Sequence, residues 1–186
     1  MKILISSILA GIMIAIGSIV YLQVGGAIGA FTFAIGLVTI TLFDLHLYTG
    51  KVSYLTKNKE LPYIGTVLLG NIIGCCTMFA FPAAAAVPIV EAKVAAHWSV
   101  TLVEAMLCNM LIYIGVEGKK KGSLATLILA VGAFILAGFE HSIASICFII
   151  SARYFTWDTL LYLIITILGN AFGGILLFRA RRYMSE

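Results

Sequence analysis

The sequence predicts an all-α membrane protein with six transmembrane helices, and three observations support this fold class. Apolar residues make up 62% of the 186 residues and charged residues only 11%, well below the roughly 25% charged residues of ordinary globular domains. The apolar residues form six runs, most of them close to the roughly 20 residues that a helix needs to cross a bilayer. The charged residues gather between these runs. By length, residues 1–186 form a single transmembrane domain.

The predicted spans cover residues 3–24, 27–47, 63–81, 100–116, 124–151 and 160–178. The second span runs into polar residues at its end, and the fifth is too long for one straight helix. We therefore expect helices two and five to be interrupted. The first run is too long for a typical signal-peptide core and no small-x-small cleavage site follows it, so we expect it to remain as a span.

Basic residues are distributed unevenly between the two ends of these spans. Of the 12 Lys and Arg residues, ten lie at the N-terminus, in loops two and four and at the C-terminus, which leaves Lys93 and Arg153 for the other side. The positive-inside rule then predicts that both termini are cytoplasmic. Trp98 and Trp157 fall at the outer interface. Short loops suit a bacterial inner membrane, so the expected location is the cell inner membrane, with multiple passes.

The two halves of the chain resemble each other, which predicts inverted repeats. Residues 43–46 (FDLH) are followed about 96 positions later by residues 139–141 (FEH), and Asn71 is followed 99 positions later by Asn170. Three spans in each half must insert in opposite senses, and inverted repeats with interrupted helices are typical of transporters. Each asparagine lies beside glycines that favour close helix packing, and is expected either to pack there or to hold an interrupted helix.

Glu140 and His141 lie side by side in an otherwise apolar span. A carboxylate and an imidazole near the centre of a bilayer cost several kcal/mol unless they face a cavity or a partner. The pair therefore predicts a pathway through the membrane. We expect Glu140 to hold structure, with Lys93, Asn170 or loop amides as partners, and a packed core histidine is the alternative interpretation of His141.

Four motifs resemble the formate/nitrite transporter family. Residues 137–144 (AGFEHSIA) look like the family's fifth-helix signature almost letter for letter, and residues 46–50 (HLYTG) are similar to its acidic-Leu-Phe-Thr-Gly loop. Residues 104–109 (EAMLCN) and 169–174 (GNAFGG) follow in the family's order. The resemblance implies an aquaporin-like six-helix protomer with its own pore, a homopentamer, and passage of formate, nitrite, hydrosulfide or similar small monovalent acids.

The resemblance also implies which residues form the pore. His141 matches the central pore histidine and Lys93 the buried lysine ahead of helix four. The other residues matched to the substrate pathway are Asn109, Leu47, Tyr48 and Thr49, and those matched to the apolar constrictions are Phe33, Leu37 and Phe134. His46 stands where the family usually has an acidic residue, and Asp44, two positions earlier, is a candidate to compensate for it.

Two physical steps are expected on this pathway. An anion crossing apolar rings loses its hydration at high cost, whereas its conjugate acid loses far less. Lys93 is expected to gather the anion through its electric field, and His141 to relay a proton or donate a hydrogen bond. As alternatives, Lys93 snorkels to the interface or pairs with Glu91, and the constriction residues are ordinary core.

Three functions fit the sequence. The first is a channel or transporter for small monovalent anions or their neutral acids, linked to protons, and the second is a hydrosulfide or small neutral-solute pore. The third, a non-conducting scaffold subunit, has no need for the polar line of Lys93, His141 and Thr49. Because no nucleophile–base set, phosphate-binding loop or metal-ligand spacing occurs, we expect no enzyme activity, cofactor, metal or nucleic-acid partner. The expected partners are the substrate and the lipid bilayer.

Overall fold

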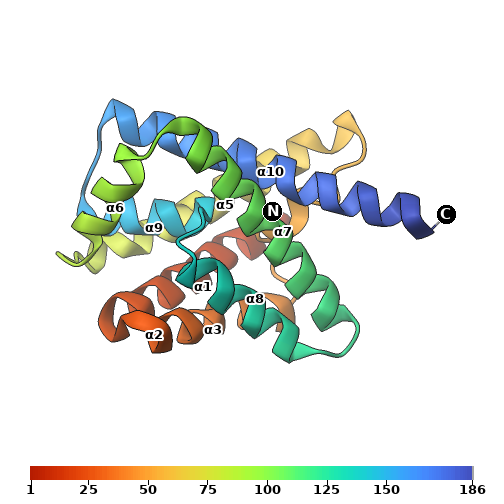
Figure 1. Ribbon diagram of the computed structural model, residues 1–186, viewed down its shortest axis with the longest axis horizontal. Helices are drawn as coiled ribbons and strands as arrows, with labels where there is room; N and C mark the ends of the chain where they lie inside the picture. The colour runs from red at the N-terminus through yellow and green to blue at the C-terminus, as the bar shows by residue number, and fades with distance from the viewer. Residues whose placement is uncertain (186) are drawn as a thin grey trace.

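The computed structural model describes residues 1–185, and helices make up most of this part of the chain (Figure 1). The first half contains α1 (Lys2–Val24), α2 (Gly26–Thr32), α3 (Ala34–Leu42), α4 (Tyr48–Val52), η1 (Asn58–Glu60), α5 (Leu61–Cys75) and η2 (Cys76–Ala80). The second half contains α6 (Ala86–Ala95), α7 (Trp98–Lys120), α8 (Leu124–Leu136), α9 (Ser142–Ala152) and α10 (Trp157–Ser185).

Six spans can be followed through these helices, as the sequence predicts. Four are continuous and long and apolar enough to cross a membrane: α1, the run Asn58–Ala80, α7 and α10. The second span consists of α2 and α3 followed, after a break, by α4, and the fifth consists of α8 followed, after a break, by α9. The prediction that spans two and five are interrupted is therefore confirmed.

The main difference from the predicted elements is α6, which lies in the third loop. The sequence here is rich in alanine, contains Pro88 and lies outside the six predicted spans. Pro88 falls in the first turn of α6, where the missing N–H of proline removes no helical hydrogen bond. A helix is therefore compatible with this proline, and it carries Lys93.

Both breaks begin with the same backbone motif. In α3, the N–H of Leu45 donates to the carbonyl of Ile40 at 2.9 Å, and Asp44 between them has a φ of 49°. The end of α8 is similar, because the backbone N–H that follows Gly138 (φ 74°) donates to the carbonyl of Phe134, also at 2.9 Å. A common way to end a helix is a left-handed residue whose successor donates its backbone N–H to the carbonyl five residues before it.

This motif relates the two breaks by a shift of 94 residues, which pairs His46 with Glu140. The expected 96-residue match, which pairs Phe43 with Phe139, is wrong by two positions in this region. The identical phenylalanines produced that match, but the hydrogen bonds that end the helices set the register.

The glycines beside the two asparagines bring the long helices of each half together. α1 packs on α5, and α7 packs on α10. A Cβ on Gly74 would overlap the carbonyl oxygen of Ile8, and a Cβ on Gly173 would overlap that of Met106. Both contacts are between backbones, so neither neighbour can rotate away. The halves are inverted repeats built on the same close contact.

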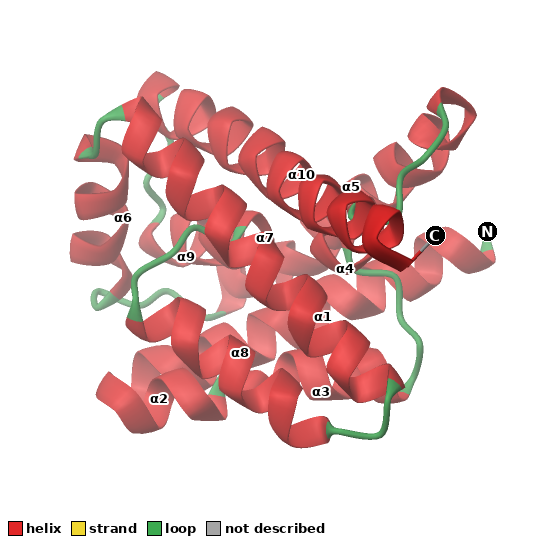
Figure 2. Cartoon of the chain, turned by 45° about the vertical axis from the view of Figure 1, so that its right-hand side comes forward, coloured by secondary structure: helices red, strands yellow, loops and turns green. Residues whose placement is uncertain are grey.

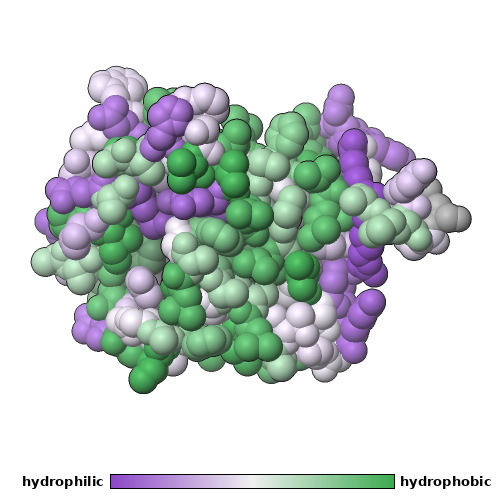
Figure 3. Space-filling view, viewed as in Figure 1, coloured by the Kyte–Doolittle hydropathy of each residue, from purple (hydrophilic) through white to green (hydrophobic). Residues whose placement is uncertain are grey.

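The chain termini and the α7–α8 connection lie at one end of the molecule, and α2 and α6 lie at the other (Figure 2). Figure 2 shows both chain termini and the connection between α7 and α8 towards its right-hand side, with α2 and α6 at the left. Hydrophobic side chains cover much of the surface between the two ends in Figure 3. Leucines on the long helices are also exposed, with Leu61, Leu69, Leu161 and Leu168 52–57% exposed, as expected for helices that face lipid.

Candidate transport pathway

Asn71 holds the break between α3 and α4 in place. Its side-chain oxygen accepts the N–H of Tyr48 at 2.7 Å, and its amide nitrogen donates to the carbonyl of His46 at 2.9 Å. The same nitrogen donates to the carbonyl of Ser7 on α1 at 2.7 Å. Leu47, the residue between the two bonded positions, is thereby fixed at the centre of the protein.

Asn170 holds the second break by the same three bonds. Its oxygen accepts the N–H of Ser142 at 2.9 Å, and its nitrogen donates to the carbonyls of Glu140 at 2.7 Å and Ala105 at 2.8 Å. The residue fixed between Glu140 and Ser142 is His141. The bonds to Glu140 and Ser142 satisfy backbone groups in the break that have no helical partner and cannot reach water. Each asparagine therefore does both of the things expected of it: it bonds to the neighbouring long helix, and it holds an interrupted helix in place.

His141 caps the start of α9 and is 2% exposed. Its Nδ1 accepts the backbone N–H of Ala144 at 3.0 Å, its Nε2 lies 3.2 Å from the hydroxyl of Thr49, and its ring stacks on Phe134. Because Nδ1 is an acceptor, the bonds assign the proton of a neutral ring to Nε2, which then donates to Thr49. The imidazole thus joins the two interrupted spans.

Two cavities approach this centre from opposite ends. The α6-side cavity, about 350 Å³ in volume, reaches Phe33, Phe134 and His141. The terminus-side cavity, about 180 Å³, reaches Leu37 and Leu47. The cavities therefore end on opposite sides of the region where the two breaks meet.

Two apolar layers separate the cavities. Phe33 and Phe134 are fully buried and meet edge to face, with ring centroids 6.4 Å apart. Leu37 and Leu47 form the second layer and are also buried. His141 contacts the first layer through Phe134.

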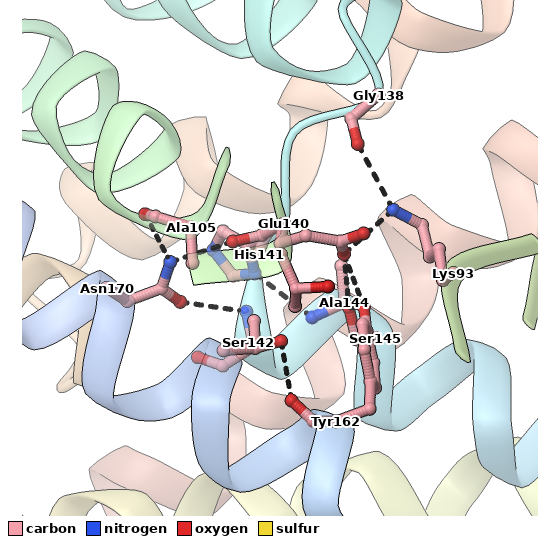
Figure 4. Close-up of polar contacts among 12 residues, drawn as sticks. Lys93, Ala105, Gly138, Glu140, His141, Ser142, Ala144, Ser145, Tyr162 and Asn170 are labelled. Atoms are coloured by element: carbon pink, nitrogen blue, oxygen red, sulfur yellow. Dashed lines mark hydrogen bonds and ion pairs between the residues drawn. The ribbon is translucent and has the colours of Figure 1, made fainter. Parts of the chain in front are cut away.

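The cationic group of Lys93 is paired with a buried carboxylate (Figure 4). Its Nζ lies 2.8 Å from Oε2 of Glu140 and 3.3 Å from the carbonyl oxygen of Gly138. The hydroxyls of Tyr162 and Ser145 donate to the same carboxylate oxygen. The side chain of Lys93 is 18% exposed and that of Glu140 2%. Lys93 thus bonds inward, where it also lines the α6-side cavity, and does not pair with Glu91.

Asn109 and Tyr48 are buried but line neither cavity. The amide nitrogen of Asn109 donates to the carbonyl of Asn170 at 2.6 Å and to the hydroxyl of Ser53 at 3.3 Å. The hydroxyl of Tyr48 donates to the carbonyl of Ile167 in α10 at 3.0 Å. Both side chains connect α4 and its surroundings to α10.

His46 and Asp44 lie near the terminus-side end. The backbone N–H of His46 donates to the hydroxyl of Ser6, and its ring meets Tyr63 edge to face. Asp44 is exposed and lines the terminus-side cavity, which His46 does not. The two side chains thus lie in different surroundings.

The model of one protein family, described as formate/nitrite transporter, matches residues 1–184. The chain belongs to the formate/nitrite transporter family. Among curated proteins, none matches the sequence. An FNT family ion channel of known structure is similar with a TM-score of 0.92 and 18% identity, over 100% of this chain and 90% of that one. A pentameric formate channel with formate bound is similar with a TM-score of 0.86 and 20% identity, over 98% of this chain and 96% of that one.

Reasoning from the sequence missed four charged residues that line the cavities of this formate/nitrite transporter family member. Glu104 lines the α6-side cavity, and Lys51, Lys119 and Lys120 line the terminus-side cavity. The cost of an ionisable group inside an apolar span, which singled out Glu140, applies equally to Glu104 in span four. Lys51 served only as a topology signal, because its place beside a cavity depends on the break before α4.

Proposed function

We propose that this protein moves small monovalent anions across a membrane, largely as their neutral acids, and that formate, nitrite and hydrosulfide form the substrate class. The observation that supports this best is that one cavity reaches His141 and a second cavity, from the opposite end, reaches Leu37 and Leu47, with apolar side chains between them. The solved formate channel that the chain resembles makes formate the first substrate to test.

The apolar layers favour the neutral acid. An anion between Phe33 and Phe134 would give up its water without gaining a hydrogen-bond donor from either ring, which costs several kcal/mol. The acid form carries no net charge and loses far less. Proton linkage follows because each acid molecule that crosses carries a proton with it.

His141 acts in this proposal as a neutral hydrogen-bond donor. A second proton would have to bind at Nδ1, which accepts the N–H of Ala144. Protonation would therefore place two donors against each other and remove the cap of α9. Of the two roles expected for His141, hydrogen bonding is better supported than proton relay. Its Nε2–H, shared with Thr49, is the polar group that we expect a solute between the layers to meet.

Replacement of His141 tests this role in proteoliposomes. His141→Phe removes both the cap and the Nε2 donor, and we expect formate flux to fall strongly. His141→Asn is the matched variant, because asparagine retains an acceptor for the cap but cannot titrate near neutral pH. We expect it to keep part of the flux with the wild-type pH profile. Unchanged flux and pH profile in His141→Phe would rule out any role in transport.

Two other functions remain to be separated by the same assay. A hydrosulfide or neutral-solute pore predicts faster flux of hydrosulfide or glycerol than of formate. A non-conducting scaffold predicts no flux of formate, nitrite, hydrosulfide or glycerol. The neutral-solute pore is supported by the ion pair between Lys93 and Glu140. Because the carboxylate offsets the charge of Lys93, the lysine attracts anions less strongly.

The assembly and location proposed are a homopentamer in the cell inner membrane with both termini in the cytoplasm. The pentameric state of the similar formate channel supports the first. The ten Lys and Arg residues on the side of the termini support the second. Mass measurement of the detergent-solubilised protein and protease accessibility of a C-terminal tag test these points independently of transport.

A further inference from the structure

Glu104 is an acidic residue on α7 that lines the α6-side cavity and is half-buried. Within residues 1–185, no group donates a hydrogen bond to its carboxylate. The side chain lines the same cavity as Glu140 and Lys93. An unbonded carboxylate in a membrane-spanning helix is costly, so its place beside the cavity calls for a role there.

The cavity that contains Glu104 carries an excess of negative charge. Lys93 is the one cationic side chain that lines it within the described part of the chain, and Glu140 already binds that ammonium at 2.8 Å. Glu104 adds a second carboxylate that has no cation of its own. A cavity with apolar walls focuses the field of such a charge.

The terminus-side cavity has the opposite excess. Its cationic lining residues are Lys51, Lys119 and Lys120, and Asp44 is the acidic residue among its described lining. Lys119 donates to the carbonyl of Thr41 at 2.7 Å, a contact that does not neutralise its charge. The two mouths of the pathway therefore differ in the sign of their charge.

We propose that Glu104 makes the α6-side cavity select the neutral acid over its anion. This inference rests on the proposed function and adds a selectivity residue to it. The carboxylate repels the substrate anion and has no such effect on the uncharged acid. The ratio of acid to anion is therefore higher inside the cavity than outside it, before either species meets Phe33 and Phe134. Protonation of Glu104 at low pH removes this discrimination.

Other titratable groups near Glu104 contribute to any pH dependence. α6 contributes Lys93, the connection between α8 and α9 contributes Glu140 and His141, α1 contributes Tyr21, and α10 contributes Tyr162 through its bond to Glu140. Each keeps its contacts when Glu104 is replaced, because none of them is hydrogen-bonded to Glu104. A change confined to Glu104→Gln therefore reports on this carboxylate.

The test compares Glu104→Gln with the wild type in proteoliposomes, with formate uptake through the α6 side measured from about pH 5 to about pH 7.5. We expect the ratio of variant to wild-type uptake to be near one at the acid end. Towards the alkaline end it should rise on the order of fivefold, the effect of removing one charge at several ångströms in a partly aqueous cavity. Glu104→Asp, which keeps the charge, should retain the wild-type profile.

Glu91→Gln is the matched control, because Glu91 is an exposed acid on α6 that does not line the cavity. It should leave uptake unchanged at every pH. A ratio for Glu104→Gln that is independent of pH, or one that falls towards the alkaline end, would overturn the inference. Absence of formate uptake by the wild type would instead count against the proposed function, so the two failures are distinguishable.

Discussion

Replacement of Asn170 by alanine should be among the most destabilising single changes in this protein. The variant loses three hydrogen bonds of 2.7–2.9 Å, but their losses are unequal. The carbonyl of Ala105 lies inside α7 and keeps its helical partner. The carbonyl of Glu140 and the N–H of Ser142 lie in the break and keep none.

The expected cost follows from these two groups. A buried backbone group left without a partner costs about 1–3 kcal/mol, and hydrogen bonds measured in membrane proteins average only about 0.6 kcal/mol. With about 1 kcal/mol for each of the two groups, we expect Asn170→Ala to lower the free energy of unfolding by about 2 kcal/mol. Asn71→Ala should cost less, because its bond to the carbonyl of His46 is only partly buried.

Unfolding of the detergent-solubilised protein with increasing denaturant, followed by circular dichroism, measures this difference. Asn58→Ala is the control, since Asn58 is exposed in η1 and should change the unfolding free energy by less than about 0.5 kcal/mol. The reasoning is refuted if Asn170→Ala is as stable as Asn58→Ala. Asn170→Asp adds a second check, because it keeps the acceptor for Ser142 but loses the donor to Glu140. It should also be destabilised.

Four further changes have defined outcomes. Gly173→Ala puts a Cβ against the carbonyl oxygen of Met106 and should lower stability by about 1–3 kcal/mol. Gly65→Ala, with open space around it, should be neutral or slightly stabilising in the same unfolding assay. Tyr48→Phe loses a bond to a carbonyl that also has a helical partner, so it should cost under about 1 kcal/mol and keep wild-type flux. Phe134→Ala removes the ring between Phe33 and His141; it should cost about 3–5 kcal/mol and admit glycerol into proteoliposomes, whereas an unchanged glycerol leak would show that this ring is no barrier.

Much of the fold could be predicted because the bilayer imposes strong rules on composition. Span count and the breaks in spans two and five follow from the length of apolar runs, and Asn71 and Asn170 were visible as repeated polar residues among glycines. What the sequence could not supply was register. The shift of 94 residues between the breaks depends on Asp44 and Gly138 in left-handed conformations, and only one of these is a glycine.

The candidate site was predictable where a residue is unusual for its surroundings. Glu140 stands out in an apolar span, and Lys93 was among its expected partners. The 2.8 Å ion pair between the two side chains confirms that partner. Contacts between ordinary residues gave no such signal. Cys75 and Cys147 lie in apolar spans far apart in the sequence, yet their sulfurs lie 3.2 Å apart across α5 and α9. Such pairs depend on how the two halves dock, which no local pattern records.

The inverted repeat explains how one scaffold can hold two different surfaces at its centre. Both asparagines bind the backbone on either side of one residue, which is Leu47 in the first break and His141 in the second. Within each break these bonds use backbone atoms only, so they place Leu47 and His141 without contacting their side chains. One break can therefore supply an apolar layer and the other a hydrogen-bond donor at equivalent positions. The imidazole on the proposed pathway is thus held through the backbone on either side of it and through its own cap of α9, and the effect that we propose for it on a passing solute depends on its ring.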